Sequence, residues 1–260
     1  MFSKEGALAL IHPERITRLI VFGDIHGDLR PLERGMELRK PGDLLLFLGD
    51  YADRGPQGVE VIEGIHQLMS IIPGKVIALM GNHEEYDEEG IPSFTPCTLI
   101  GEASRKRGGW DVFFRNFSLF TSKLSLAAVL PGYALFAHGG ICREIRSAEM
   151  LKTPSREVKR QLLWGDPSSE NGEYMSYRGA GKLFGPDVSA EVLTTLGLEK
   201  FFRSHEPRKA FNGPAIEHGS TVITTSTTGI YGGRPFVLTL DTSHLPRSDQ
   251  EIHDSVHFLD

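Results

Sequence analysis

The sequence predicts an α/β fold, because one pattern occurs three times in the first half of its 260 residues. In each occurrence an apolar run ends on a small polar cluster, and a stretch compatible with a helix follows. Apolar runs of four or five residues suit strands that are buried on both faces, as in sheets covered by helices. The three runs and their clusters are 19–22 with GDIHG (23–27), 44–48 with GD (49–50), and 76–80 with GNHE (81–84).

Two helical stretches separate these expected strands. Residues 31–39 and 58–70 have helical character, and Val59, Ile62 and Ile65 lie roughly on one face of the second stretch. Strands and helices therefore alternate as βαβ units. Catalytic and binding groups in such sheets gather at the carboxyl ends of the strands, so polar clusters that are distant in sequence can converge there.

The second half of the chain has a different pattern. A helical stretch at 101–117 precedes two strands, 126–130 and 133–137, which Pro131-Gly132 joins in a tight turn. No internal repeat interrupts the sequence, so we expect one domain over residues 1–260, with a poorly ordered tail at 244–260. The remaining expected elements are helices at 144–163 and 187–196, a strand at 201–204, and antiparallel strands at 221–225 and 236–240.

The composition is that of a globular protein, since 40% of the residues are hydrophobic and 24% are charged. A formal net charge of -6 argues against a general nucleic-acid binder, which normally presents a basic face to the phosphate backbone. No apolar run approaches the ~20 residues that a membrane-spanning helix needs. The two cysteines, Cys97 and Cys142, are widely separated and are expected to be free thiols. We therefore expect a cytoplasmic protein with no membrane partner.

The expected strand ends carry residues that can ligate a metal ion. Carboxylates and imidazoles suit divalent cations such as manganese, iron and zinc, and neighbouring glycines let the backbone turn sharply around a site. A single Asp or His at a strand end is more often a cap or a hydrogen-bonded core residue, so the signal comes from the set. Its members are Asp24, His26, Asp50, Asn82, His138 and His205.

Seven segments occur in an order that is informative as a whole: GDIHG (23–27), GDYADRG (49–55), GNHE (81–84), HGG (138–140), LLWGDP (162–167), RG (178–179) and RSHE (203–206). In these motifs the chain resembles the phosphoprotein phosphatase family of serine/threonine phosphatases, within the calcineurin-like metallophosphoesterases. The resemblance covers most of the chain and implies a β-sandwich of two mixed sheets flanked by helices. After HGG the chain continues Ile141-Cys142-Arg143 instead of the usual LSP, which indicates a compact prokaryotic or archaeal-type member.

The resemblance also implies a metal centre with two divalent ions. In two-metal sites the ions lie ~3.5–4 Å apart and lower the pKa of bound water towards roughly 7, which produces a hydroxide nucleophile at neutral pH. Manganese is expected for activity, with iron and zinc as alternatives, because the ligand set discriminates weakly. One ion would be held by Asp24, His26 and Asp50, and the other by the bridging Asp50 together with Asn82, His138 and His205.

Further roles follow from the resemblance. His83 is implied to be the general acid that protonates the leaving group, with Asp53 beside it to favour the imidazolium. Arg54 and Arg178 match the phosphate clamps of the family, since planar guanidinium groups bind phosphoryl oxygens in bidentate fashion. Tyr231 corresponds to a tyrosine at the rim of the family's active site. Other interpretations stay open: a metal-binding or structural His83, surface salt bridges for the arginines, and a structural aromatic at Tyr231.

The expected reaction is hydrolysis of phosphoserine or phosphothreonine in proteins by direct attack of a metal-bridging hydroxide. A diadenosine tetraphosphatase or another small-molecule phosphoesterase is the alternative, because such enzymes share the same metal scaffold. GDYADRGP and Glu84 favour the protein phosphatases. An inactive phosphoprotein-binding module would lack ligands, whereas all six ligand positions are filled here. The expected partners are phosphorylated proteins or peptides, and no regulatory subunit is implied.

Overall fold

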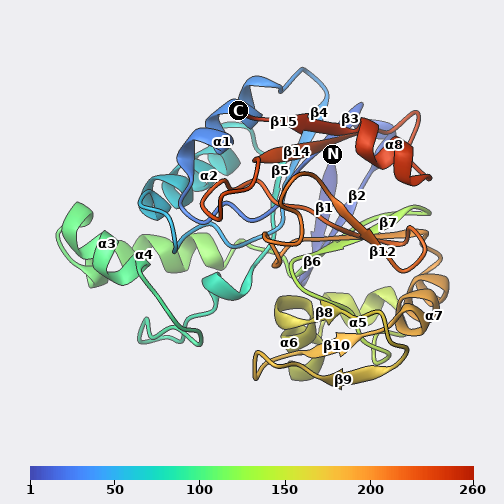
Figure 1. The fold of residues 1–260 in the computed structure, drawn as a ribbon. Helices are drawn as coiled ribbons and strands as arrows, with labels where there is room; N and C mark the ends of the chain where they lie inside the picture. Colours follow the sequence, from blue (N-terminus) through green and yellow to red (C-terminus); the bar gives the residue numbers. More distant parts are fainter.

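Two β-sheets pack face to face in the computed structural model of the chain, which describes residues 1–260 (Figure 1). A third, small sheet lies apart from them, in the lower part of the view. The five-stranded sheet has the order β15 (Val256–Phe258), β14 (Phe236–Asp241), β3 (Arg18–Phe22), β4 (Asp43–Phe47), β5 (Val76–Ala78). The seven-stranded sheet has the order β1 (Phe2–Glu5), β2 (Leu8–Ile11), β6 (Ala127–Leu130), β7 (Ala134–Ala137), β11 (Lys200–Arg203), β13 (Val222–Thr224), β12 (Ala215–Glu217). The small sheet has the order β8 (Asp166–Pro167), β10 (Lys182–Phe184), β9 (Glu173–Met175).

Both large sheets mix parallel and antiparallel pairs. In the five-stranded sheet β3, β4 and β5 run parallel, whereas β14 pairs antiparallel with both β3 and β15. In the seven-stranded sheet β7, β11 and β13 run parallel, and β6 and β7 form the antiparallel hairpin that Pro131-Gly132 predicts. The predicted βαβ units and the α/β class are therefore confirmed, and the two mixed sheets form the expected sandwich.

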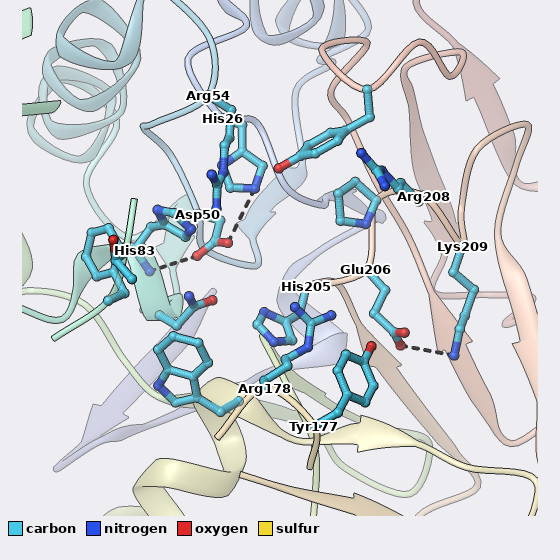
Figure 2. Close-up of a pocket in the computed structure, with 16 residues that line it drawn as sticks. His26, Asp50, Arg54, His83, Tyr177, Arg178, His205, Glu206, Arg208 and Lys209 are labelled. Atoms are coloured by element: carbon cyan, nitrogen blue, oxygen red, sulfur yellow. Dashed lines mark hydrogen bonds and ion pairs between the residues drawn. The ribbon is translucent and has the colours of Figure 1, made fainter. Parts of the chain in front are cut away.

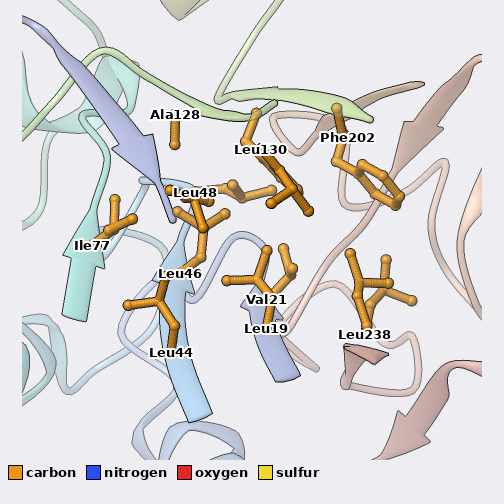
Figure 3. Close-up of a cluster of buried hydrophobic side chains, with 14 of the residues drawn as sticks. Leu19, Val21, Leu44, Leu46, Leu48, Ile77, Ala128, Leu130, Phe202 and Leu238 are labelled. Atoms are coloured by element: carbon orange, nitrogen blue, oxygen red, sulfur yellow. The ribbon is translucent and has the colours of Figure 1, made fainter. Parts of the chain in front are cut away.

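The central core lies between the two large sheets (Figure 3). Alternate residues of each strand point into it, as the two-residue period of a strand requires. Leu19 and Val21 of β3 face the core, and Phe136 of β7 and Phe202 of β11 meet them from the other sheet. The intervening residues, such as Ile20 on β3, point to the outer face. Both faces of each sheet are thus apolar, which explains the continuous apolar runs in the sequence.

Helices cover the outer faces of both sheets (Figure 1). Burying these faces removes apolar surface from water, which contributes roughly 25 cal/mol per Å² and so stabilises the four-layer packing. Against the five-stranded sheet lie α1 (Leu29–Glu37), α2 (Gly58–Ile71), α3 (Leu99–Arg107) and α4 (Trp110–Thr121). Against the seven-stranded sheet lie α5 (Ala148–Lys152), α6 (Arg156–Trp164) and α7 (Pro186–Leu196).

Two expected helices are each divided in the structure. The stretch 101–117 becomes α3 and α4, because Gly108 and Gly109 adopt φ angles of 77° and 143° that no helix contains. The stretch 144–163 becomes α5 and α6, with Pro154 between them. Proline disfavours the helical conformation in the preceding residue, and Thr153 accordingly has φ -128° and ψ 68°.

The expectation of a poorly ordered tail at 244–260 is wrong. The tail forms α8 (Asp249–Asp254), which begins with a capping box between Ser248 and Glu251, and then β15, which pairs with β14. Ile252 of α8 is fully buried in the central core. The strands expected at 221–225 and 236–240 both form, but they lie in different sheets.

Two further expectations concern cysteines and membrane segments. Cys97 and Cys142 form no disulfide, as expected for free thiols. None of the helices combines the length and the apolar character that crossing a membrane requires.

Candidate metal centre and active site

Six side chains from five segments meet where strands of both sheets end. Three segments follow β3, β4 and β5, and two follow β7 and β11. The parallel pairing within each group explains the convergence, because parallel strands end at the same edge of a sheet. All six residues are buried, with at most 6% exposure: Asp24, His26, Asp50, Asn82, His138 and His205.

Asp50 lies at the centre of these side chains. Its Oδ2 is 3.5 Å from Nε2 of His26, and its Oδ1 is 3.3 Å from Nε2 of His138. The same His138 nitrogen is 3.0 Å from Oδ1 of Asn82 and 3.0 Å from Nδ1 of His205. Two groups of potential ligand atoms, each within 4.8 Å of one another, therefore share Asp50. A bridging ligand of a two-metal site needs this position.

Two buried polar atoms in the cluster have no hydrogen-bond partner. Asp24 uses Oδ1 to accept hydrogen bonds from the Ser204 hydroxyl and, at 3.0 Å, from the backbone N–H of His205, but its Oδ2 has no partner. Nε2 of His205 also has none. Buried polar atoms are almost always paired, so such orphans need an explanation. Ligation of a cation supplies one, and the residues therefore fit a metal site.

The electrostatics of the cluster also fit cation binding. Burial, reinforced by His83, lowers the pKa of His26 to about 3, and burial lowers the pKa values of His138 and His205 well below the usual range. These imidazoles are therefore neutral at physiological pH, as metal ligation requires. Burial raises the pKa of Asp24 to about 6 and that of Asp50 well above its usual value. A bound cation would relieve this unfavourable burial of two carboxylates.

The backbone of the site is strained. Five non-glycine residues here have φ between 49° and 72°, a region that usually costs of order 1–3 kcal/mol for each such residue. Strain of this kind persists only where the surrounding structure fixes it, and it aims the side chains of neighbouring residues at a common point. The five residues are His26, Asp50, Asp53, Arg54 and His205.

His83 and Asp53 form a second buried arrangement next to the ligand cluster. Nδ1 of His83 lies 2.7 Å from Oδ2 of Asp53, and Oδ1 of Asp53 accepts a hydrogen bond from the Leu99 N–H at 2.8 Å. Burial lowers the pKa of His83, and the carboxylate of Asp53 opposes that effect. Burial would raise the pKa of Asp53, but its hydrogen bonds, chiefly with His83, hold it below the usual value.

Distance alone leaves two roles open for His83. A nitrogen of its ring lies within 4.8 Å of ligand atoms of His26 and Asp50, so the structure keeps the metal-binding interpretation available. However, Nδ1 is already occupied by Asp53. The backbone N–H of His83 also donates to Oδ1 of Asp50 at 3.0 Å, which fixes the histidine relative to the ligand cluster.

A cavity of about 590 Å³ opens over the cluster (Figure 2). Four of the six predicted metal ligands line it, while Asp24 and His138 lie beneath its floor. Arg54 and Arg178 approach it from opposite sides. All the remaining predicted catalytic and substrate residues except Asp53 reach the cavity wall: His83, Arg54, Arg178 and Tyr231.

Arg178 is held by a chain of ion pairs. Its Nε lies 2.6 Å from Oδ2 of Asp166, whose Oδ1 is 2.8 Å from Nη2 of the fully buried Arg203. A side chain fixed in this way is oriented before a ligand arrives, and its remaining N–H groups stay free for an anion. Sequence reasoning did not single out Asp166 or Arg203, although both lie within matched segments.

Tyr231 lies on the cavity wall between aromatic and cationic neighbours. Its ring centre is 5.6 Å from that of His26, and the guanidinium carbon of Arg208 lies 5.8 Å from the Tyr231 ring centre. Burial raises the pKa of the Tyr231 hydroxyl, so it is protonated at neutral pH and able to donate a hydrogen bond. Arg208 was also missed, and no motif in the sequence marks it.

Glu84 has a structural role beside the cluster that the sequence did not predict. Its side chain is buried. Its carboxylate accepts hydrogen bonds from the backbone N–H groups of Asp50 at 2.8 Å, Tyr51 at 2.9 Å and Gly81 at 2.9 Å. These bonds connect the loop after β4 with the loop after β5. The position of Asp50 between the two groups of ligands therefore depends on Glu84.

Comparison with known proteins identifies the family. Residues 17–209 match the model of the calcineurin-like phosphoesterase family, and the chain belongs to that family, as the motifs predict. Serine/threonine-protein phosphatase PP1-1 of Saccharomyces cerevisiae is 34% identical over 203 residues, which are 73% of this chain and 62% of the relative. Serine/threonine-protein phosphatase T of Aspergillus oryzae is 31% identical over 233 residues, 85% of this chain and 47% of the relative.

A solved structure has the same fold. It is a protein serine/threonine phosphatase from Saccharomyces cerevisiae with similarity to human phosphatase PP5, and it superposes with a TM-score of 0.80 at 26% identity. The match covers 98% of this chain and 83% of that chain. The chain spans about half the length of the first curated relatives that it matches.

Proposed function

We propose that this chain is a metal-dependent phosphatase that hydrolyses phosphoserine and phosphothreonine in proteins with two divalent metal ions. The observation that carries the proposal is the convergence of six buried ligand residues, the His83–Asp53 pair and two arginines at one cavity. The names of the relatives support the substrate class, since they are serine/threonine-protein phosphatases. We expect manganese in the site, with iron and zinc as alternatives.

In this proposal the ligand residues would divide into two groups around Asp50. Asp24 and His26 would hold one ion together with Asp50, and the remaining three would hold the other. The two ions would supply Lewis acidity and would lower the pKa of bound water. Because Asp50 is tied through its backbone to Glu84, the spacing of the two groups is set by the protein. The second group is completed by Asn82, His138 and His205.

The other side chains would act on the phosphoryl group itself. Arg54 and Arg178 would bind its non-bridging oxygens, and the Tyr231 hydroxyl would donate a further hydrogen bond. His83 would deliver a proton to the departing serine or threonine oxygen. Asp53 would hold the His83 ring in place and favour its protonated form. No protein nucleophile is needed.

The setting of the enzyme follows from the same reasoning. We propose that residues 1–260 act as a single domain, because both sheets supply ligands to one cluster. Phosphorylated proteins or peptides are the proposed partners, with no role for nucleic acid, membranes or regulatory subunits. A cytoplasmic location agrees with the two unpaired cysteines.

One comparison of substrates tests the proposal. Metal-free protein is reconstituted with Mn²⁺, and turnover of a phosphothreonine peptide, a phosphotyrosine peptide and diadenosine tetraphosphate is measured under the same conditions. We expect the phosphothreonine peptide to have the highest kcat/KM. A preference for the dinucleotide would overturn the substrate class but would leave the metal site standing. Peptide binding without turnover of any substrate would favour the binding module instead.

A further inference from the structure

A second cavity, of about 720 Å³, opens beside the first. It lies between the loop that follows GNHE, residues 85–95, and α6, and residues 178–180 close one end. The two cavities share four lining residues, so they form a continuous path: Phe94, Thr95, Trp164 and Arg178. We call this second cavity the α6 groove. A peptide that extends from the first cavity past Arg178 would enter the α6 groove.

The α6 groove is cationic, although the protein as a whole is acidic. Four cations line it, namely Arg178 and three residues of α6, against the two carboxylates Glu85 and Asp87. Lys159 is neutralised by Glu85, at 3.0 Å. Oδ1 of Asp87 is occupied by the backbone N–H groups of its own loop.

Two arginines of the α6 groove remain without a carboxylate partner. Arg160 donates one hydrogen bond to the backbone oxygen of Gly179 at 2.9 Å and keeps its other N–H groups free. Arg156 is exposed and forms no ion pair. Both residues are four positions apart, so they project from one face of α6 on successive turns. They form a row of unpaired positive charge that begins next to the phosphate clamp Arg178.

We propose that the α6 groove binds the segment of a peptide substrate that flanks the phosphorylated residue, and that Arg156 and Arg160 select anionic side chains in that segment. The inference rests on the proposed phosphatase function, because it concerns the residues that flank the phosphorylated residue of the same substrate. Its ligand chemistry is a carboxylate or a second phosphate, both of which guanidinium groups bind.

The spacing of the two arginines fits an extended peptide. Residues one helical turn apart lie roughly 5–6 Å from each other. Alternate residues of an extended chain point to the same side and are separated by about 6.6 Å. Two anionic side chains at alternate positions of the flank therefore match the two arginines. The apolar residues of the opposite wall, Ile91, Pro92 and Phe94, would contact the rest of the peptide.

Four phosphothreonine peptides test this inference. One has neutral flanks, one has two aspartates at alternate positions before the phosphothreonine, and one has them after it. The fourth carries non-hydrolysable phosphonate analogues of phosphoserine at alternate positions on the preferred side. We expect one acidic flank to raise kcat/KM about five- to tenfold, mainly through KM, since exposed ion pairs contribute modestly. The phosphonate peptide, which the enzyme cannot cleave at its flank, separates selection of a second phosphate from selection of a carboxylate.

Variants assign the effect to the α6 groove. In a protein with Arg156→Glu and Arg160→Gln, the ratio of acidic to neutral peptide turnover should fall to about one. Arg115→Glu, which reverses an exposed charge on α4, should keep the full ratio. Retention of the preference in the double variant, or equal turnover of all peptides by the unchanged protein, would overturn the inference.

A binding measurement separates this inference from the proposed function. Fluorescence anisotropy of the same peptides on the metal-loaded His83→Asn protein reports the flank preference while turnover is slowed about 10²–10⁴-fold. If the unchanged protein cleaves p-nitrophenyl phosphate but no peptide, the proposed function fails. Equal binding of acidic and neutral peptides to the His83→Asn protein would refute the role of the α6 groove in either case.

Discussion

Nδ1 of His83 lies 2.7 Å from Oδ2 of Asp53, and both side chains are buried. The second carboxylate oxygen is fixed by the N–H of Leu99, so Asp53 cannot turn away from the histidine. Because His83 lines the catalytic cavity, this pair leaves Nε2 as the ring nitrogen that a substrate can reach. A ring held at Nδ1 by a carboxylate, with Nε2 free, suits a metal ligand as well as a proton donor. The role proposed for His83 is that of the proton donor.

Replacement of His83 by asparagine tests that assignment. The change removes the proton donor but none of the six proposed ligands, so we expect kcat for a phosphothreonine peptide to fall about 10²–10⁴-fold. Steady-state kinetics with Mn²⁺ measure this. Isothermal titration with Mn²⁺ should show two ions bound, as in the unchanged protein. His253→Asn, at an exposed position of α8, serves as the matched control. Near-normal turnover of the His83 variant would remove the histidine from the mechanism.

Replacement of Arg54 by alanine tests the phosphate clamp. Arg54 is exposed on the cavity wall and its pair of donors would complement the charge that spreads over the phosphoryl oxygens. We expect kcat to fall by about 10²–10³, as for the loss of one donor that stabilises a transition state. Arg54→Lys keeps the charge but loses the planar fork, so only part of the activity should return. If Arg54→Lys is fully active, bidentate binding is not required.

The sequence predicted that the candidate ligands converge, because each of them lies shortly after an apolar run. Asp24 and Asp50 come two and three residues after β3 and β4, and the parallel pairing of these strands brings them together. The local sequence thus indicated which residues follow a strand. That catalytic groups gather at the carboxyl ends of the strands in α/β sheets indicated that these residues lie close together. The sequence could not predict that Oδ2 of Asp24 has no hydrogen-bond partner or that Asp50 lies at the centre, because both depend on the three-dimensional packing.

Other features depend on contacts that no local pattern records. Arg156 and Arg178 share the α6 groove although they are 22 positions apart in the sequence, and Arg208 meets Tyr231 only through the packing of two loops. The expected helices were too long because the apolar period continues across Gly108 and Pro154. β15 has only three residues, too few for a period, and forms by pairing with β14.

Replacement of Asp24 by asparagine should make the metal-free protein more stable at neutral pH. Burial raises the pKa of Asp24 to about 6. The folded protein therefore retains a proton that the unfolded chain releases near pH 4. The protonated Asp24 contributes to stability below that pH, and this contribution is lost as the pH rises through about 6. The difference corresponds to about 3 kcal/mol. Asparagine does not ionise and avoids this loss.

Thermal unfolding in the presence of a chelator measures the effect. The Tm of Asp24→Asn should exceed that of the unchanged protein at pH 8, and the two should coincide near pH 4. Addition of Mn²⁺ should raise the Tm of the unchanged protein, because the ions bind only the folded state, and should raise that of the variant much less. A variant that is less stable at pH 8 without metal would contradict the cost of burying Asp24.

Replacement of Ile252 by alanine tests whether the C-terminal tail belongs to the core. Ile252 is fully buried between the two sheets, so its truncation should lower the free energy of unfolding by about 2–5 kcal/mol. Urea denaturation measures the change. His253→Ala alters the next residue, which is exposed, and should stay within about 0.5 kcal/mol of the unchanged protein. Because Ile252 packs in the core between the sheets and does not line the cavity over the candidate ligands, Mn²⁺-dependent turnover at low temperature should persist in Ile252→Ala. An equally small effect of both substitutions would mean that α8 does not contribute to the core.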